Sequence, residues 1–165
     1  MNNTVNGRAF VYGPNVDTDQ IYPGRFLDLT DPAAIGGHAM EGADPDFVKR
    51  FQSGDLVVAG TNFGCGSSRE HAVITLKAAG VGAIIAESFA RIFYRNAINL
   101  GVPALVCPGV TKLVSSGDRL RVDLAGGAIV NETTGATLRA EPFSDYVLNI
   151  LDSGGIKPMM LYKLN

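Results

Sequence analysis

Gly60-Thr61-Asn62-Phe63-Gly64-Cys65-Gly66-Ser67-Ser68-Arg69-Glu70-His71-Ala72 is the stretch from which the fold of this chain is best predicted. It follows a short apolar run at residues 56–59, which is typical of a buried strand. After it, apolar residues recur at helical spacing, which predicts a helix with one apolar face. The glycines between the two elements allow the backbone to turn sharply or to approach a ligand closely. The stretch is therefore interpreted as a strand-to-helix loop of an α/β protein.

The polar side chains of this loop predict a site for a small anion. Ser67 and Glu70 have the spacing of a capping box, so we expect Ser67 to cap the helix and the helix N-terminus to face the loop. Arg69 adds a planar guanidinium suited to a carboxylate or a phosphate. A P-loop would have a Lys where Gly66 leads directly into Ser67, so a small carboxylic acid is favoured. A purely structural glycine-rich turn with a capped helix has the same local pattern.

Residues 64–71 (GCGSSREH) resemble the signature of the swivelling domain of the aconitase family, in particular of the small subunits of 3-isopropylmalate dehydratase and its relatives. Residues 13–21 (GPNVDTDQI) and 86–101 (AESFARIFYRNAINLG) resemble two further family motifs, and the three occur in family order. The resemblance implies one β/β/α swivelling domain with a mixed sheet over residues 1–165. It also implies the small subunit of a two-subunit hydro-lyase that interconverts 2- and 3-isopropylmalate in leucine biosynthesis.

The resemblance further implies which residues form the site. Ser67 matches the general base of the family, and Ser68 and Arg69 match its clamp for substrate carboxylates. Asp19 matches an active-site acid that partners a histidine of the other subunit or domain. The loop Phe26-Leu27-Asp28-Leu29 occupies the position that, in the family, lies over the substrate and helps to choose its side chain.

Asp28 bears on the substrate class. Like charges repel, so Asp28 argues against a third substrate carboxylate, while Phe26, Leu27 and Leu29 could face an apolar branch. The sequence is equally consistent with Asp28 pointing to solvent and the leucines lying in the core. Other hydroxy-dicarboxylates, of the dimethylmalate, citramalate, citrate or homoaconitate type, are alternative substrates within the family. From another class, a non-catalytic anion-binding regulatory domain is the alternative.

Composition limits what the chain holds by itself. It has two cysteines, Cys65 and Cys107, whereas an iron–sulfur cluster usually takes three or four thiolates. We therefore expect no metal on this chain and, from the resemblance, a [4Fe–4S] cluster on a large subunit in a heterodimer or heterotetramer. The net charge of −2 argues against nucleic acid, and no apolar run approaches the ~18 residues that span a bilayer. The N-terminus lacks the apolar core of a signal peptide, so a cytoplasmic location is expected.

The order of the predicted elements indicates a mixed sheet. Alternating buried strands and helices in the first two thirds imply parallel strands with right-handed crossovers. After a first strand at residues 8–12, the parallel strands are expected at 56–59, 83–86 and 103–107. We expect one helix that Ser67 caps and whose apolar stripe runs from Ala72 to Ala79, a second helix at 90–100, and a mainly helical stretch at 32–53. Period-two alternation then predicts an antiparallel meander, with strands at 119–124, 128–130 and 137–139. Ser144 is expected to cap a helix at 145–151, and Asp17 to cap a turn.

Overall fold

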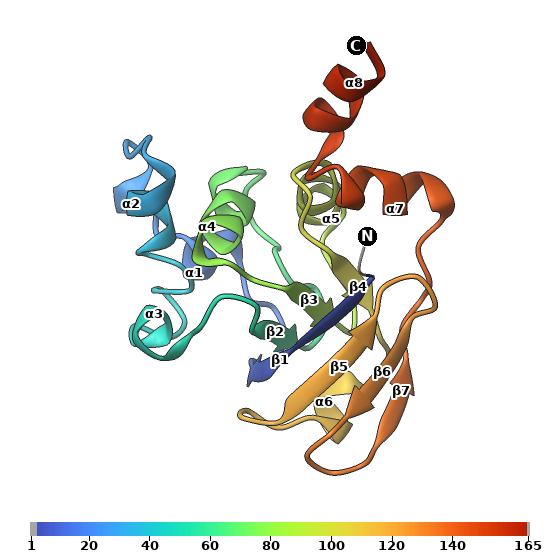
Figure 1. The fold of residues 1–165 in the computed structure, drawn as a ribbon. Coiled ribbons are helices and arrows are strands. Elements are labelled where there is room, and N and C mark those ends of the chain that lie inside the picture. Colours follow the sequence, from blue (N-terminus) through green and yellow to red (C-terminus); the bar gives the residue numbers. More distant parts are fainter. Residues whose placement is uncertain (1–2, 165) are drawn as a thin grey trace.

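The computed structural model describes residues 3–164 and contains one seven-stranded mixed sheet with helices on both faces (Figure 1). The order of the strands across the sheet is β4-β3-β2-β1-β5-β6-β7. The strands are β1 (Thr4–Val11), β2 (Leu56–Ala59), β3 (Ala83–Ala86), β4 (Ala104–Val106), β5 (Arg119–Asp123), β6 (Ala128–Asn131) and β7 (Thr137–Arg139). Strands β1 to β4 are parallel and β5 to β7 form the expected meander, which confirms the predicted fold class.

Strand β1 joins the parallel and antiparallel halves of the sheet. Residues 9–11 pair in parallel with β2, whereas residues 4–8 pair antiparallel with β5. Gly7 lies in the second ladder, where a Cβ would come within 2.9 Å of the Asp55 Cα, so a side chain has no room there. The predicted strand began at Arg8, and the observed one begins at Thr4. The additional residues are held by their pairing with β5, which the local sequence does not show.

Successive strand residues point to opposite faces and so build two cores. Val57 and Ile84 pack with the helices α4 and α5, whereas Val58 and Ile85 belong to the core on the side of α6. Figure 1 shows α4, α5 and α7 on one side of the sheet and α6 on the other. The helices are α1 (Thr18–Ile21), α2 (Pro32–Gly36), α3 (Phe47–Arg50), α4 (His71–Ala79), α5 (Arg91–Asn99), α6 (Val110–Leu113), α7 (Asp145–Asp152) and α8 (Ile156–Leu164), with a 3-10 turn η1 (Gly24–Phe26).

Most of the predicted helices are confirmed, with a few departures. Ser144 caps α7 as expected, its Oγ accepting the Val147 N–H at 3.2 Å. The stretch 32–53, expected to be mainly helical, contains only the short helices α2 and α3. The short helices α1 and α6 and the C-terminal α8 were not predicted. Among the described helices, none has the length and apolar content needed to cross a membrane.

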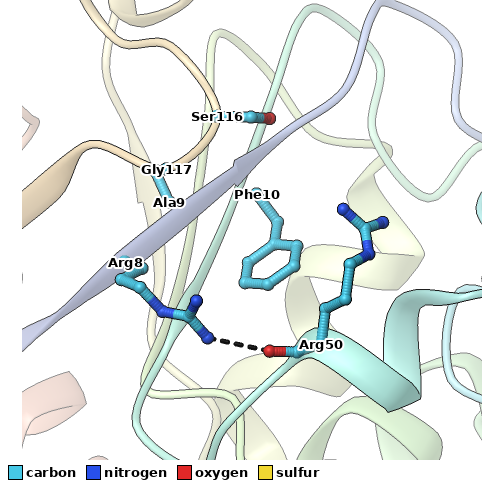
Figure 2. A pocket seen from close by; sticks show the side chains of 6 residues that line it. All are labelled: Arg8, Ala9, Phe10, Arg50, Ser116 and Gly117. Carbon is cyan, nitrogen blue, oxygen red and sulfur yellow. Dashed lines mark hydrogen bonds between the residues drawn. The ribbon is translucent and has the colours of Figure 1, made fainter.

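Asp55, in the turn before β2, ties β1 to the parallel half of the sheet. Its carboxylate, almost fully buried, accepts the backbone N–H groups of Arg8 and Gln52 at 3.0 Å each and the Arg8 Nη2 at 2.8 Å. Arg8 Nη2 also donates to the Arg50 carbonyl at 2.8 Å, beside an open cavity of about 340 Å³ (Figure 2). Burial alone would raise the pKa of Asp55, but these hydrogen bonds outweigh it and lower the pKa.

Replacing Asp55 with Asn removes the charge while keeping the shape. At pH 7 we expect the variant to lose roughly 1.5–3 kcal/mol of unfolding free energy, the worth of a hydrogen bond to a charged group. Because the folded pKa lies below the ordinary value of 3.8, the stabilisation is present above that value and is lost as the pH falls through the folded pKa. Urea denaturation from pH 7 to pH 3 measures this, with Asp152→Asn at an exposed carboxylate as the control. A constant difference down to pH 3 would contradict the account.

Candidate active site

Three loops leave the carboxyl ends of β1, β2 and β3, and the middle one is hydrogen-bonded to the other two. They contain the motifs at residues 13–21, 60–72 and 86–101. Ligands of open α/β sheets bind outside the carboxyl ends of parallel strands, so this edge is the expected place for a site. The bonds run from Gly64 N–H to the Val16 carbonyl (2.8 Å), from Thr18 N–H to the Cys65 carbonyl (2.8 Å), and from Phe63 N–H to the Ser88 carbonyl (3.1 Å).

Two glycines allow the central loop to fit between its neighbours. Gly64 and Gly66 have φ of 84° and 102°, in the left-handed region that L side chains rarely adopt. A Cβ on Gly64 would overlap the Phe93 ring of α5, and one on Gly66 would lie 3.2 Å from Thr18 Oγ1. The loop therefore requires glycine at both positions for its course towards Ser67.

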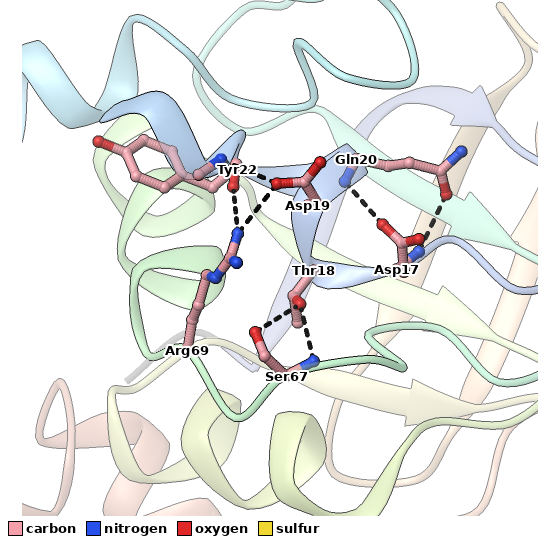
Figure 3. A network of polar contacts seen from close by, with 8 residues as sticks. Asp17, Thr18, Asp19, Gln20, Tyr22, Ser67 and Arg69 are labelled. Carbon is pink, nitrogen blue, oxygen red and sulfur yellow. Dashed lines mark hydrogen bonds and ion pairs between the residues drawn. The ribbon is translucent and has the colours of Figure 1, made fainter. Parts of the chain in front are cut away.

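Ser67 does not cap α4, so the predicted capping box is wrong. The helix begins at His71, and Glu70 occupies the N-cap position without a capping side-chain bond. Ser67 Oγ instead lies 3.1 Å from Thr18 Oγ1, which also accepts the Ser67 N–H at 3.2 Å (Figure 3). The physical reason is that the Ser67 hydroxyl, which the local pattern predicted to bond the first backbone N–H groups of the helix, contacts Thr18 of another loop instead. The helix N-terminus consequently lies further along the chain than Ser67.

Thr18 is a site residue that the sequence analysis missed. It is 3% exposed and begins α1, where Asp17 forms a capping box with Gln20, which confirms the structural role expected for Asp17. Because Thr18 Oγ1 accepts from the Ser67 N–H, its own hydrogen can be donated to Ser67 Oγ. A hydrogen bond of that kind favours a negatively charged oxygen. Its position inside the motif at residues 13–21 was the only signal for Thr18.

Arg69 and Asp19 are brought together on the α1 side of the loop. Arg69 Nη1 lies 3.1 Å from Asp19 Oδ1 and 3.3 Å from the Tyr22 carbonyl oxygen, and the Gly24 N–H donates to Asp19 Oδ1 at 2.8 Å. The Gly24 N–H and then the Arg69 guanidinium lower the pKa of Asp19, so this acid is ionised at neutral pH. Within the described chain Asp19 thus has Arg69 as its charged partner.

The predicted specificity loop begins at the last residue of η1, and its four residues are exposed or partly exposed. The Phe26 ring is stacked on His38 with 3.6 Å between ring centroids, so one of its faces is already covered. Leu27 is 39% exposed and Leu29 partly exposed, so the alternative that both leucines are core residues is wrong for Leu27. Asp28 is exposed, and its charge adds to burial in raising the pKa of the Tyr22 phenol.

Ser67 and Ser68 line an open cavity of about 320 Å³ beside α5. The other side chains around it are those of Ala90, Arg91, Ile92 and Arg95, and none of the described residues contributes a carboxylate to its lining. The sequence pattern indicated this helix only as part of a motif, and none of its residues was predicted to belong to the site. The spacing of Arg91 and Arg95, which places two guanidinium groups on one helix face, was the available signal.

The cysteines do not fit a metal cluster on this chain. Cys65 lies in the central loop and is partly exposed, whereas Cys107 follows β4 and is fully buried, which raises its pKa. Among residues 3–164, His, Cys, Asp and Glu side chains do not gather in threes as a metal site requires.

The chain was compared with protein families and with proteins of known name or structure. The family model described as "Aconitase C-terminal domain" matches residues 9–108. A "3-isopropylmalate dehydratase small subunit 1" from Methanopyrus kandleri is 53% identical, over 94% of this chain and 92% of that protein. An "Isopropylmalate/citramalate isomerase small subunit" from Methanocaldococcus jannaschii is 49% identical, over 99% of this chain and 98% of that protein.

A solved structure shows the same fold throughout. The crystal structure of 3-isopropylmalate dehydratase from Methanocaldococcus jannaschii superposes with a TM-score of 0.93 and 42% identity. The match covers 98% of this chain and 95% of that chain, so it includes the loops that form the site. From its sequence, its sheet and this match, the chain belongs to the aconitase C-terminal domain family, among the small subunits of 3-isopropylmalate dehydratases.

Proposed function

We propose that the chain, with a large subunit, interconverts 2- and 3-isopropylmalate by dehydration and rehydration in leucine biosynthesis. The observation that carries the proposal is the position of Ser67. Ser67 is an exposed residue whose hydroxyl is hydrogen-bonded to Thr18, at the edge of a cavity that the described residues line with two guanidinium groups and without a carboxylate. That arrangement suits an anionic hydroxy acid, and the names of the relatives agree with it.

The reaction requires a base, a carboxylate clamp and a Lewis acid for the leaving hydroxyl. Ser67 is proposed as the base, with Ser68 and Arg69 as the clamp and Asp19 as the acid that holds Arg69. The two cysteines are too few for a cluster, so we assign a [4Fe–4S] cluster to the large subunit, in a heterodimer or heterotetramer. A cytoplasmic location stays a prediction.

A serine is a weak base unless its alkoxide is stabilised. Thr18 can donate to Ser67 Oγ at 3.1 Å, and Arg69 and the α5 arginines provide positive charge around the loop. Arg69 engages Asp19 and Tyr22 through Nη1, and no described residue bonds its other two nitrogens, so it can also bind a carboxylate. Ser67 would then take the proton on the carbon beside a bound carboxylate.

The test of the function is turnover by the chain assembled with the large subunit of the same organism. We expect conversion of 2-isopropylmalate by the complex and none by either subunit alone. Citramalate belongs in the panel, because the relative from Methanocaldococcus jannaschii is named for both substrates. Asp28 is proposed to disfavour a third carboxylate, so homoaconitate should be the poorest substrate. Tight anion binding without turnover of any panel member would favour the regulatory-domain alternative.

Ser67→Ala and Ser67→Gly remove the proposed base. We expect kcat of the assembled enzyme to fall by about 10²- to 10⁴-fold in both, the usual contribution of general-base catalysis. The melting temperature should change little, because Ser67 is exposed and does not cap α4. Steady-state kinetics and thermal unfolding measure the two effects, with Ser153→Ala as the exposed-serine control. Near-parental kcat in Ser67→Gly would assign the proton transfer to another group.

Arg69→Lys keeps the positive charge but loses the planar fork. We expect KM for 2-isopropylmalate to rise by roughly tenfold or more, since a hydrogen bond to a charged group is worth about 1.5–3 kcal/mol. Loss of the guanidinium should also raise the pKa of Asp19, while the Gly24 N–H still holds it low. Kinetics and an NMR titration of the carboxyl carbons measure both changes. Arg25→Lys, on an exposed arginine paired with Glu41, is the control, and an unchanged KM would remove Arg69 from the clamp.

A further inference from the structure

We infer that Arg91 and Arg95 of α5 bind a carboxylate of the substrate, as a second anion subsite beside Ser68. The inference rests on the proposed function and extends it, because these arginines lie outside the Ser67–Arg69 segment. They line the same cavity as Ser67 and Ser68, but they belong to α5 and not to the loop. A dicarboxylate has two anionic ends, and Arg69 provides a cation for only one of them.

The first observation is that these two arginines lack protein partners. Within residues 3–164 neither guanidinium group makes a hydrogen bond, an ion pair or a ring contact. All other arginines in the described chain are engaged through their guanidinium groups, namely Arg8, Arg25, Arg50, Arg69, Arg119, Arg121 and Arg139. The unpartnered guanidinium groups of the described chain are therefore concentrated in one cavity, that of the proposed base.

The second observation is their geometry on the helix. Arg91 and Arg95 are four residues apart and so lie on one face of α5, where like charges repel each other. A carboxylate between or beside them would relieve that repulsion. No acidic side chain lines the cavity, so the protein itself does not neutralise them there.

A comparison within the molecule supports this interpretation. The cavity beside β1 is also lined by two arginines, Arg8 and Arg50, but Asp55 and Asp44 pair with them at 2.8 and 2.7 Å. In the cavity beside α5, no described carboxylate pairs with Arg91 or Arg95. This cavity therefore attracts an anion, whereas the positive charge of the cavity beside β1 is already paired with Asp55 and Asp44.

Arg95 is the more isolated of the two cations. Arg91 also borders a neighbouring hollow that contains Glu141, although the two side chains form no ion pair. Ile92 lies between the two arginines in sequence, is 49% exposed and lines the same cavity. A ligand with a carboxylate and a branched aliphatic group, such as isopropylmalate, matches both features of this wall.

The test uses the assembled two-subunit enzyme with Arg91→Gln and Arg95→Gln small subunits. We expect KM for 2-isopropylmalate to rise at least tenfold in each, with partial recovery in Arg91→Lys and Arg95→Lys. Calorimetric titration of each complex with 2-isopropylmalate measures affinity without requiring turnover. It should rank the parent first, the Lys variants next and the Gln variants last. Arg121→Gln, at an exposed arginine of β5, is the matched control and should leave both quantities unchanged.

Two results would overturn the inference. One is a KM and a calorimetric affinity within twofold of the control in both Gln variants. The other is weaker subunit association at unchanged substrate affinity, which would show that the arginines contact the large subunit instead. Failure of the proposed function has a different signature, because the parent complex would then lack turnover. In that case arginine-dependent binding in the calorimeter would still support the subsite.

Discussion

The site depends on one constraint, which is that the loop after β2 is fixed on both sides by backbone hydrogen bonds. On the side of the β1 loop, the Val16 carbonyl accepts from Gly64 and the Cys65 carbonyl accepts from Thr18. On the side of the β3 loop, the Ser88 carbonyl accepts from Phe63. Since Gly64 and Gly66 adopt left-handed conformations, the loop can pass close to Phe93 and Thr18 without steric overlap. The position of Ser67 thus follows from the sheet edge and not from the start of α4. Changes in the glycines or in the flanking loops would displace the proposed base indirectly.

The charges around this loop fall into two groups. Arg69 is compensated by Asp19, which a backbone N–H and the guanidinium keep ionised, and this pair fixes the side chain on the α1 side. Arg91 and Arg95 lack any such compensation within the described chain and face the cavity from α5. One arginine held by an ion pair and two arginines without a counter-charge therefore lie around the same serine. The Arg69–Asp19 pair orients the Arg69 guanidinium on the α1 side, and the two α5 arginines attract an anion from the other side.

Local patterns in the sequence were enough to predict most of the fold. The buried runs of β2 and β3, the alternation of β5 and the Ser144 cap are each properties of a few neighbouring residues. The site was less accessible to such reasoning. Ser67 carries a capping-box pattern, but its hydroxyl contacts Thr18, which is 49 positions away in sequence. The resemblance to the family indicated Ser67, whereas Thr18 and the α5 arginines became apparent only from the folded loops.

The most direct test of the account is a crystal structure of the assembled complex of this chain and its large subunit, with an unreactive hydroxy-dicarboxylate bound. The account predicts one carboxylate within hydrogen-bond distance of Arg91 or Arg95, the other beside Ser68 or Arg69, and Ser67 Oγ facing the carbon between them. A ligand bound wholly within the large subunit, with the cavity beside α5 filled by partner side chains, would contradict it.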